Sequence, residues 1–335
     1  MMKAEWVDNA KQYLHVKDGI ELERELEEKI CKFTGASYCT VVNSGTNALY
    51  MAMLIPLKQF TYYKDKKDIL VPNYGHPAIE KCCIALGLNP IYVGMDPKTL
   101  SMDFKKAESK ITSKTAAIVH VENNGVIGRD IFKFRKLCND YNLLLVEDAA
   151  PSMIQRIDQI NAGVIGDIGI YSFSYSKPFH CGEGAAIVTK NQYFDKAFKA
   201  YRYNHNYMDM GMNLNFSLSP YLIAMLLPQF ETINNVIKTR EDVHAEYKSH
   251  GIPVFEEEGV TNRYPYAMLI NDNASNISRK LNNFKIGHRY MYYPVYDYDE
   301  ITIQTRSKLI DLPCHEDLTS AQIKTISTLI KKELV

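Results

Sequence analysis

The sequence has 335 residues, of which 46% are hydrophobic and 23% charged, and this composition excludes a disordered or fibrous protein. Its 39 basic and 39 acidic residues cancel, so bulk electrostatic binding to nucleic acid or to an anionic membrane is not expected. The seven cysteines are scattered and include no Cys-x-x-Cys pair, which is typical of reduced thiols in a cytoplasmic protein. Because no stretch has the roughly twenty apolar residues of a membrane span, and Glu5 and Asp8 interrupt the start, neither anchoring nor export is expected.

Short β-rich runs alternate with helical patterns between residues 35 and 189, which predicts a parallel sheet covered by helices. The predicted strands are 38–42, 69–71, 90–93, 116–121, 143–146, 168–173 and 185–188. The predicted helices between them are 46–54, 77–85, 104–109, 129–141 and 193–201. Seven strands make a wide sheet.

A long helical pattern from residue 220 to about 250 follows and connects to a smaller C-terminal domain. That domain is predicted to hold strands near 264–269 and 287–293 and a closing helix at 320–332. We therefore predict a large domain over residues 1–235, with an N-terminal helical segment, and a small domain over residues 236–335.

Two segments carry side chains suited to chemistry. The apolar run 143–146 ends in Glu147 and Asp148, which places Asp148 at the carboxyl edge of a parallel sheet, where open α/β folds bind ligands. Capping of the next segment is the alternative interpretation. Lys177 follows a predicted strand and precedes Pro178, among hydroxyls and glycines, and a lysine on such a constrained turn suits a Schiff base. An ordinary surface lysine is the alternative.

A third segment, Val42 to Leu49, runs from a strand through Ser44, Gly45 and Thr46 into a helix. Free backbone N–H groups and a hydroxyl at a helix N-terminus suit a phosphate. A simple serine N-cap is the alternative, and the absence of a following Gly-Lys-Ser/Thr excludes a Walker loop.

In this order the three segments resemble the pyridoxal phosphate enzymes of the aspartate aminotransferase fold, or fold type I. Within them the chain resembles the sugar aminotransferase family often called DegT/DnrJ/EryC1/StrS. The likeness extends over nearly the whole chain, through Phe33 to Ala36, Val71-Pro72, Asp96-Pro97 with Thr99, Leu100 and Asp103, Gly166-Asp167, Ser172-Phe173, Gly182 to Gly184, Gly211 with Asn213, Tyr293-Pro294 and Leu312-Pro313. It implies a large domain with a mostly parallel seven-stranded sheet and a small C-terminal α/β domain.

The resemblance implies a catalytic pair. Lys177 matches the lysine that binds pyridoxal phosphate as a Schiff base and shuttles the proton, and Asp148 matches the carboxylate that pairs with the pyridine nitrogen. An anion there raises the pKa of that nitrogen and keeps it protonated, so that the ring accepts electrons.

The resemblance also implies further cofactor contacts. Gly45 and Thr46 match the phosphate turn, and Ser172 matches a side-chain phosphate ligand. Asn213 matches an asparagine that reaches the phosphate of the neighbouring subunit, which implies a homodimer with shared active sites. His76 falls where the family usually has an aromatic residue stacked on the pyridine ring.

Three positions depart from the family pattern. Pro151 stands where a glutamine often lies beside the phenolic oxygen of the cofactor, Ser174 replaces a frequent histidine, and Asn215 replaces a frequent arginine. Each puts substrate contacts in doubt while leaving the catalytic pair in place.

The expected function is transfer of the amino group of L-glutamate to a nucleotide-linked 4-keto-6-deoxyhexose. A dTDP-4-keto-6-deoxy-glucose type of sugar aminated at C4 is favoured, for bacterial O-antigen or other surface-glycan amino sugars. Amination at C3 of a dTDP- or UDP-linked 3-keto sugar is the alternative. Arg202 and Arg289 are candidates for the diphosphate, although each is also explained as a surface residue.

Other functions were weighed against this one. A family offshoot dehydrates keto sugars with histidine in place of the lysine, and Lys177 argues against it. A cysteine desulfurase would use Cys181 or Cys314 as nucleophile, whereas a small buried residue is the alternative interpretation of Cys181. A non-catalytic binding or regulatory protein predicts a damaged catalytic pair, and both members are present. No metal is expected, because the nine histidines form no ligand cluster.

Overall fold

The computed structural model describes residues 4–59, 63–202, 215–256, 259–261, 267–291 and 293–334. The helices are α1 (Ala4–Leu14), α2 (Gly19–Thr34), α3 (Gly45–Gln59), α4 (Ala78–Ala85), α5 (Phe104–Ser109), α6 (Ile131–Tyr141), α7 (Gln192–Arg202), α8 (Pro220–Leu226), α9 (Gln229–Ser249), α10 (Ala274–Asn283), α11 (Glu300–Lys308) and α12 (Ser320–Lys331). The strands are β1 (Tyr38–Val42), β2 (Asp68–Pro72), β3 (Asn89–Val93), β4 (Thr115–Val121), β5 (Leu144–Asp148), β6 (Arg156–Ile157), β7 (Ile160–Asn161), β8 (Ile168–Ser172), β9 (Ala185–Thr189), β10 (Val260–Thr261), β11 (Ala267–Ile270), β12 (Arg289–Tyr290) and β13 (Leu309–Leu312).

The largest sheet has seven strands in the order β1-β9-β8-β5-β4-β2-β3. Strands β3, β2, β4, β5 and β8 pair in parallel, whereas β9 runs antiparallel to β1 and to β8. Every residue of β4 and β5 is buried, as expected where both faces of a parallel sheet are covered. The predicted mostly parallel seven-stranded sheet is therefore confirmed.

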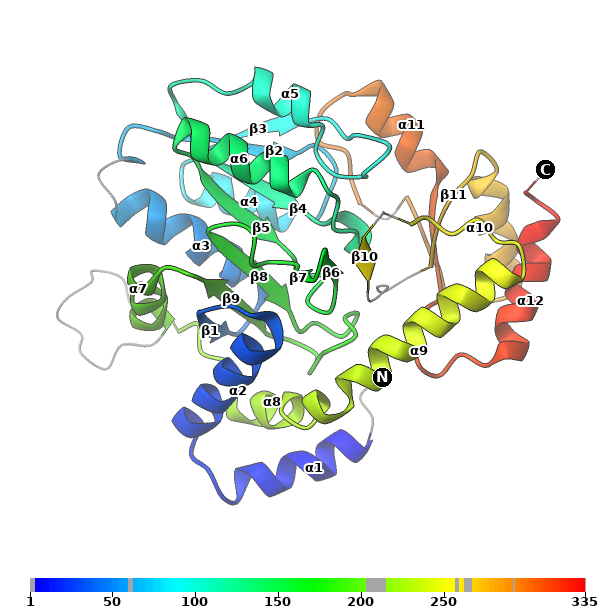
Figure 1. The fold of residues 1–335 in the computed structure, drawn as a ribbon, viewed down its shortest axis with the longest axis horizontal. Coiled ribbons are helices and arrows are strands. Elements are labelled where there is room, and N and C mark those ends of the chain that lie inside the picture. Colours follow the sequence, from blue (N-terminus) through cyan, green and yellow to red (C-terminus); the bar gives the residue numbers. More distant parts are fainter. Residues whose placement is uncertain are drawn as a thin grey trace.

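Helices cover both faces of this sheet (Figure 1). One hydrophobic core joins α2, α5, α6 and α8 to strand residues such as Ile118 and Leu145. The other joins α3, α4 and α7 to their neighbours in the strands, Val119 and Val146. Because successive side chains of a strand point to opposite faces, the apolar strands serve both cores.

The predicted single helix from residue 220 to 250 is wrong in one respect. α8 ends at Leu226 and α9 begins at Gln229, with Pro228 at the N-cap of α9. Proline has no N–H to donate to the preceding turn, which interrupts the helix at this point. Figure 1 shows α9 continuing from α8 past the large sheet to the C-terminal helices.

The C-terminal elements form a second, smaller sheet that packs with helices around its own core. This sheet has the antiparallel order β11-β13-β12, and its core includes Val243, Ile277, Leu312 and Ile326. The predicted strand near 287–293 is the short β12, and the central strand β13 was not predicted. The proposed boundary between residues 235 and 236 falls inside α9 and stays a prediction.

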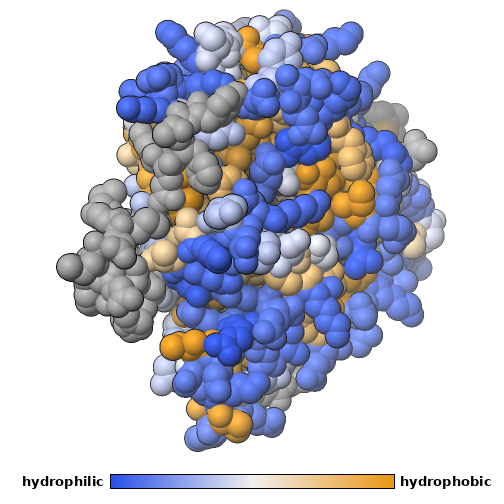
Figure 2. Space-filling model, turned by 60° about the vertical axis from the view of Figure 1, so that its left-hand side comes forward, coloured by the Kyte–Doolittle hydropathy of each residue, from blue (hydrophilic) through white to orange (hydrophobic). Residues whose placement is uncertain are grey.

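Hydrophilic residues cover most of the face drawn in Figure 2, with hydrophobic residues visible between them. No helix among the described residues is both long enough and apolar enough to cross a membrane.

Candidate active site

Asp148 ends the central strand β5. It lies in register with Val121 of β4 and Ile170 of β8, at the carboxyl edge where ligands bind in such sheets. The side chain is only 4% exposed, and Oδ1 accepts a hydrogen bond of 3.1 Å from the Ala150 N–H. Burial raises the pKa of Asp148, while that N–H and then the Lys177 ammonium oppose the rise. A cationic group beside this carboxylate would stabilise its charge.

Lys177 lies on the loop between β8 and β9, which we call the lysine loop (residues 173–184). The Lys177 N–H donates to Ser174 O at 2.9 Å, and the Phe173 N–H donates to Gly184 O at 2.8 Å. Gly182 and Gly184 have φ of +100° and +116°, which favours glycine at both. The loop thus holds the backbone of Lys177 in a fixed turn.

Gln229, the first residue of α9, anchors the same loop. Its Oε1 accepts from the His180 N–H at 3.2 Å, and its Nε2 donates to His180 O at 2.8 Å. Nε2 also donates to Met225 O, and Gln229 is 4% exposed. No sequence signal pointed to this residue, because its partners are backbone groups about 50 residues earlier and on the preceding helix.

Burial makes the Lys177 amine easier to deprotonate than an ordinary lysine. Burial lowers the pKa of Lys177 to about 8, Asp148 opposes this change, and the Arg289 guanidinium adds to it. Among the described residues no hydrogen-bond partner of Nζ is found. A lysine with a pKa near neutrality serves as a nucleophile and as a proton carrier.

The N-terminus of α3 lies beside the end of β8. Ser44 Oγ accepts from the Asn47 N–H at 3.2 Å and caps the helix, so the N-cap interpretation holds. Ser172 Oγ would lie 3.6 Å from a Cβ built on Gly45, which brings the first turn of α3 and the Ser172 hydroxyl together. Thr46 is exposed on that turn. Backbone N–H groups and two hydroxyls here suit an anion.

Asn213, the predicted ligand from a neighbouring subunit, lies outside the described residues. The segment that follows it returns to the turn: the Asn43 N–H donates to Phe216 O at 2.8 Å, and Asn43 Nδ2 donates to Asn215 O at 3.3 Å. This part of the chain therefore lies next to the N-terminus of α3.

His76 follows β2, which is parallel to β4 in the same sheet. Its Nδ1 accepts from the Ala78 N–H at 3.2 Å, and its ring lies edge-on to Tyr293, with 6.4 Å between centroids. The surrounding protein lowers the pKa of His76, Asp148 opposes this, and Lys177 adds to it. The imidazole therefore lies close enough to Asp148 and Lys177 for both charges to act on its pKa.

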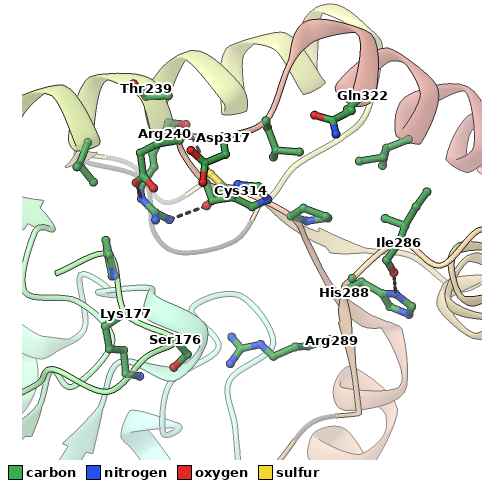
Figure 3. A pocket seen from close by; sticks show the side chains of 18 of the residues that line it. Ser176, Lys177, Thr239, Arg240, Ile286, His288, Arg289, Cys314, Asp317 and Gln322 are labelled. Carbon is green, nitrogen blue, oxygen red and sulfur yellow. Dashed lines mark hydrogen bonds and ion pairs between the residues drawn. The ribbon is translucent and has the colours of Figure 1, made fainter. Parts of the chain in front are cut away.

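A cavity of about 1110 Å³ opens beside Lys177. The lysine loop contributes Ser176 and Lys177, β12 contributes Arg289, and α9 and α12 form the opposite wall (Figure 3). In Figure 3 the Arg289 guanidinium points across the cavity toward Ser176 and Lys177. Arg202, the second diphosphate candidate, is not part of this lining, because it pairs with Glu23 and Glu27 in the large domain.

The two candidate nucleophilic thiols are packed instead. Cys181 is 1% exposed and its Sγ donates to Glu183 O, and Cys314 is 2% exposed with Sγ directed to Arg240 O. Burial raises the pKa of each thiol to about 12. A neutral buried thiol is a poor nucleophile, which disfavours the desulfurase alternative. Within the described ranges, no group of three or more His, Cys, Asp or Glu residues is placed to hold a metal.

These side chains and backbone groups fit the polar groups of pyridoxal phosphate. The N-terminus of α3 with Ser172 suits its phosphate, the Lys177 amine suits its aldehyde, and the buried Asp148 carboxylate suits its ring nitrogen. All three come together at one edge of the sheet. Pro151 carries no side-chain donor for the phenolic oxygen, as the sequence indicated.

Comparison with known proteins places the chain in a family. The model of the DegT/DnrJ/EryC1/StrS aminotransferase family matches residues 3–331. A GDP-perosamine synthase of Vibrio cholerae is 24% identical over 97% of this chain and 92% of that protein. A UDP-2-acetamido-2-deoxy-3-oxo-D-glucuronate aminotransferase of Pseudomonas aeruginosa is 26% identical over 96% of this chain and 98% of that protein.

Among solved structures, Helicobacter pylori PseC, an aminotransferase involved in the biosynthesis of pseudoaminic acid, superposes with a TM-score of 0.87. It is 20% identical, and the match covers 100% of this chain and 97% of that one. The chain therefore belongs to the DegT/DnrJ/EryC1/StrS aminotransferase family, whose members are pyridoxal-phosphate-dependent enzymes of fold type I.

Proposed function

We propose that this protein transfers the amino group of L-glutamate to the C4 keto group of a nucleotide-linked 4-keto-6-deoxyhexose. The observation that carries the proposal is the Asp148 and Lys177 pair at one edge of the sheet, with Lys177 in the lining of a cavity of about 1110 Å³. A cavity of this size accommodates a nucleotide sugar.

The cofactor would be held by groups from three parts of the chain. Asp148 pairs with the ring nitrogen, Lys177 binds the aldehyde carbon, and His76 packs on the ring. Gly45, Thr46 and Ser172 bind the phosphate, and Asn213 contributes from the second subunit of a homodimer. When bound, pyridoxal phosphate supplies an electron sink for the carbon that loses or gains a proton.

Lys177 then works in both half-reactions. In the first, its Nζ takes the proton from the α-carbon of glutamate; the amino group would remain with the cofactor, and water would supply the keto oxygen of the 2-oxoglutarate that leaves. In the second, Nζ returns a proton to the sugar carbon; the keto oxygen of the sugar would leave as water, and the sugar would depart with the amino group. The Asp148 carboxylate holds the proton at the ring nitrogen throughout. The total reaction is glutamate plus keto sugar giving 2-oxoglutarate plus amino sugar.

A homodimer is part of the proposal, and two exposed aromatic side chains are candidates for its contact surface. Tyr175, two residues before Lys177, is 76% exposed in the single chain, and Tyr221 on α8 is 68% exposed. Sedimentation velocity should give a dimer, and a monomer at micromolar concentration would contradict shared active sites.

The nucleotide and the keto position are tested with a panel of acceptors. [15N]Glutamate is supplied with dTDP-, GDP- and UDP-linked 4-keto-6-deoxyhexoses and with 3-keto sugars, and the products are located by NMR. Incorporation of 15N at C4 of one acceptor, first of all the dTDP-linked 4-keto-6-deoxy-glucose, supports the proposal. Incorporation at C3 favours the alternative, as the name of the Pseudomonas relative, with its 3-oxo sugar, does. Loss of water from the sugar without 15N uptake would establish a dehydratase.

A further inference from the structure

A buried carboxylate, Asp311, holds Arg289 in the wall of the cavity. Asp311 lies on the central strand β13, directly opposite Arg289 of β12. Its Oδ2 accepts from Arg289 Nε at 3.1 Å and lies 2.9 Å from Nη2. Asp311 is 3% exposed, and burial raises its pKa to about 6 while Arg289 opposes the rise. The two donors on one oxygen fix the plane of the guanidinium.

The same carboxylate connects the C-terminal sheet to the large sheet. Asp311 Oδ1 accepts from Asn124 Nδ2 at 3.4 Å, and Asn124 follows β4 with φ of +54°. Arg289 is further oriented by the Tyr293 ring, whose centroid lies 6.0 Å from the guanidinium carbon. The position of Arg289 is therefore set by Asp311 and Tyr293 and, through Asp311, by Asn124 of the segment that follows β4.

Arg289 and Lys177 line one cavity, and the Arg289 charge acts on the lysine, whose pKa it helps to lower. Lys177 must reach the reacting carbon of both substrates in turn. Both substrates carry an anionic group, the carboxylates of glutamate and the diphosphate of the nucleotide sugar. Guanidinium recognises carboxylate and phosphate with the same planar donors.

On the basis of the proposed function, we infer that Arg289, positioned by Asp311, is one anion subsite used by both substrates in alternation. It binds a carboxylate of glutamate in the first half-reaction and the diphosphate of the nucleotide sugar in the second. Neither half-reaction then needs a separate cationic site beside Lys177, and the departing anion of one substrate makes room for the other.

The test uses the enzyme loaded with pyridoxal phosphate and two unreactive probes, glutarate and inorganic pyrophosphate, in isothermal titration calorimetry. Each probe should bind, and saturation with one should abolish binding of the other. Arg289→Gln should weaken both probes at least tenfold, and Asp311→Asn should weaken both by a smaller factor. Arg306→Gln is the matched control, because Arg306 lies on α11, bonds to Met291 O and is outside the cavity lining.

Independent binding of the two probes, or loss of only one in Arg289→Gln, would overturn the shared subsite. Unchanged binding in Asp311→Asn would overturn the positioning role. If Arg289→Gln does not fold, Arg289→Lys serves instead: it keeps the charge without the planar fork, and wild-type affinity for both probes would contradict the inference. If the two probes compete but [15N]glutamate transfers no 15N to any acceptor of the panel described above, the proposed function is refuted and the shared subsite still stands.

Discussion

The Lys177 amine should react with acylating reagents at a pH where ordinary lysines do not. Its pKa is lowered from 10.5 to about 8, mainly by burial. At pH 7 about a tenth of such amines are neutral, compared with about one in three thousand at the ordinary lysine pKa. The cofactor-free protein should therefore label at Lys177 roughly 20-fold faster than at other lysines, after allowance for the lower nucleophilicity of a weaker base.

Competitive trace acetylation across a pH series, read by peptide mass spectrometry, measures this rate. Lys199 is the internal control, because its neighbours Glu27 and Asp195 outweigh partial burial and raise its pKa. Asp148→Asn should move the Lys177 inflection to lower pH by removing an anion, and Arg289→Gln should move it to higher pH by removing a cation. An inflection for Lys177 near 10.5, the ordinary lysine value, would refute the reasoning.

Four further substitutions, one of them a control, test the site and its support. Asp148→Asn should lower kcat about 100-fold or more with little change in Tm, because an amide cannot hold the proton on the ring nitrogen; unchanged steady-state kinetics would contradict this role. Gln229→Leu removes three buried hydrogen bonds and should lower the free energy of unfolding in urea by about 1–3 kcal/mol, with faster loss of cofactor on dialysis. Gly163→Ala should lower the free energy of unfolding by about 2 kcal/mol or more, because φ is +82° and the new Cβ would lie 2.7 Å from Tyr171. Gly87→Ala is the control: φ is +64° but the space around it is open, so the same urea titration should show a loss of only about 1 kcal/mol.

The position of Asp148 and Lys177 at one edge of the sheet could be predicted because it depends on local signals. An all-apolar strand that ends in Asp148 must lie inside a parallel sheet, and the carboxyl ends of such strands meet at one edge. Lys177 follows another strand of the same sheet, so the order of the motifs brought both to that edge. Ser44 marked the start of α3 through its capping side chain.

The support around the pair could not be predicted, because it depends on tertiary packing. Gln229 holds the lysine loop through backbone atoms that have no sequence signature. Asp311 interrupts the apolar strand β13. A lone acid between Ile310 and Leu312 indicates a buried partner, but the sequence does not show which residue that partner is. Its partner, Arg289, lies 22 residues earlier, so the pairing became visible only with the register of the small sheet.

The helix after residue 219 shows the limit of periodicity. The apolar spacing continued across Pro228 and predicted one helix, whereas the missing N–H divides it into α8 and α9. Arg202 shows the same limit for charges: a sequence reveals a cation but not whether carboxylates such as Glu27 already surround it.

The most direct test of the account is the visible absorption spectrum of the purified protein with pyridoxal phosphate, recorded before and after addition of glutamate and then of a keto-sugar nucleotide. The account predicts a band of the protein-bound cofactor near neutral pH that glutamate bleaches and one keto sugar restores, and that Lys177→Ala does not form. A band that appears equally in Lys177→Ala, or one that ignores glutamate, would contradict the assignment of Lys177 and Asp148 as the pair that transfers the amino group.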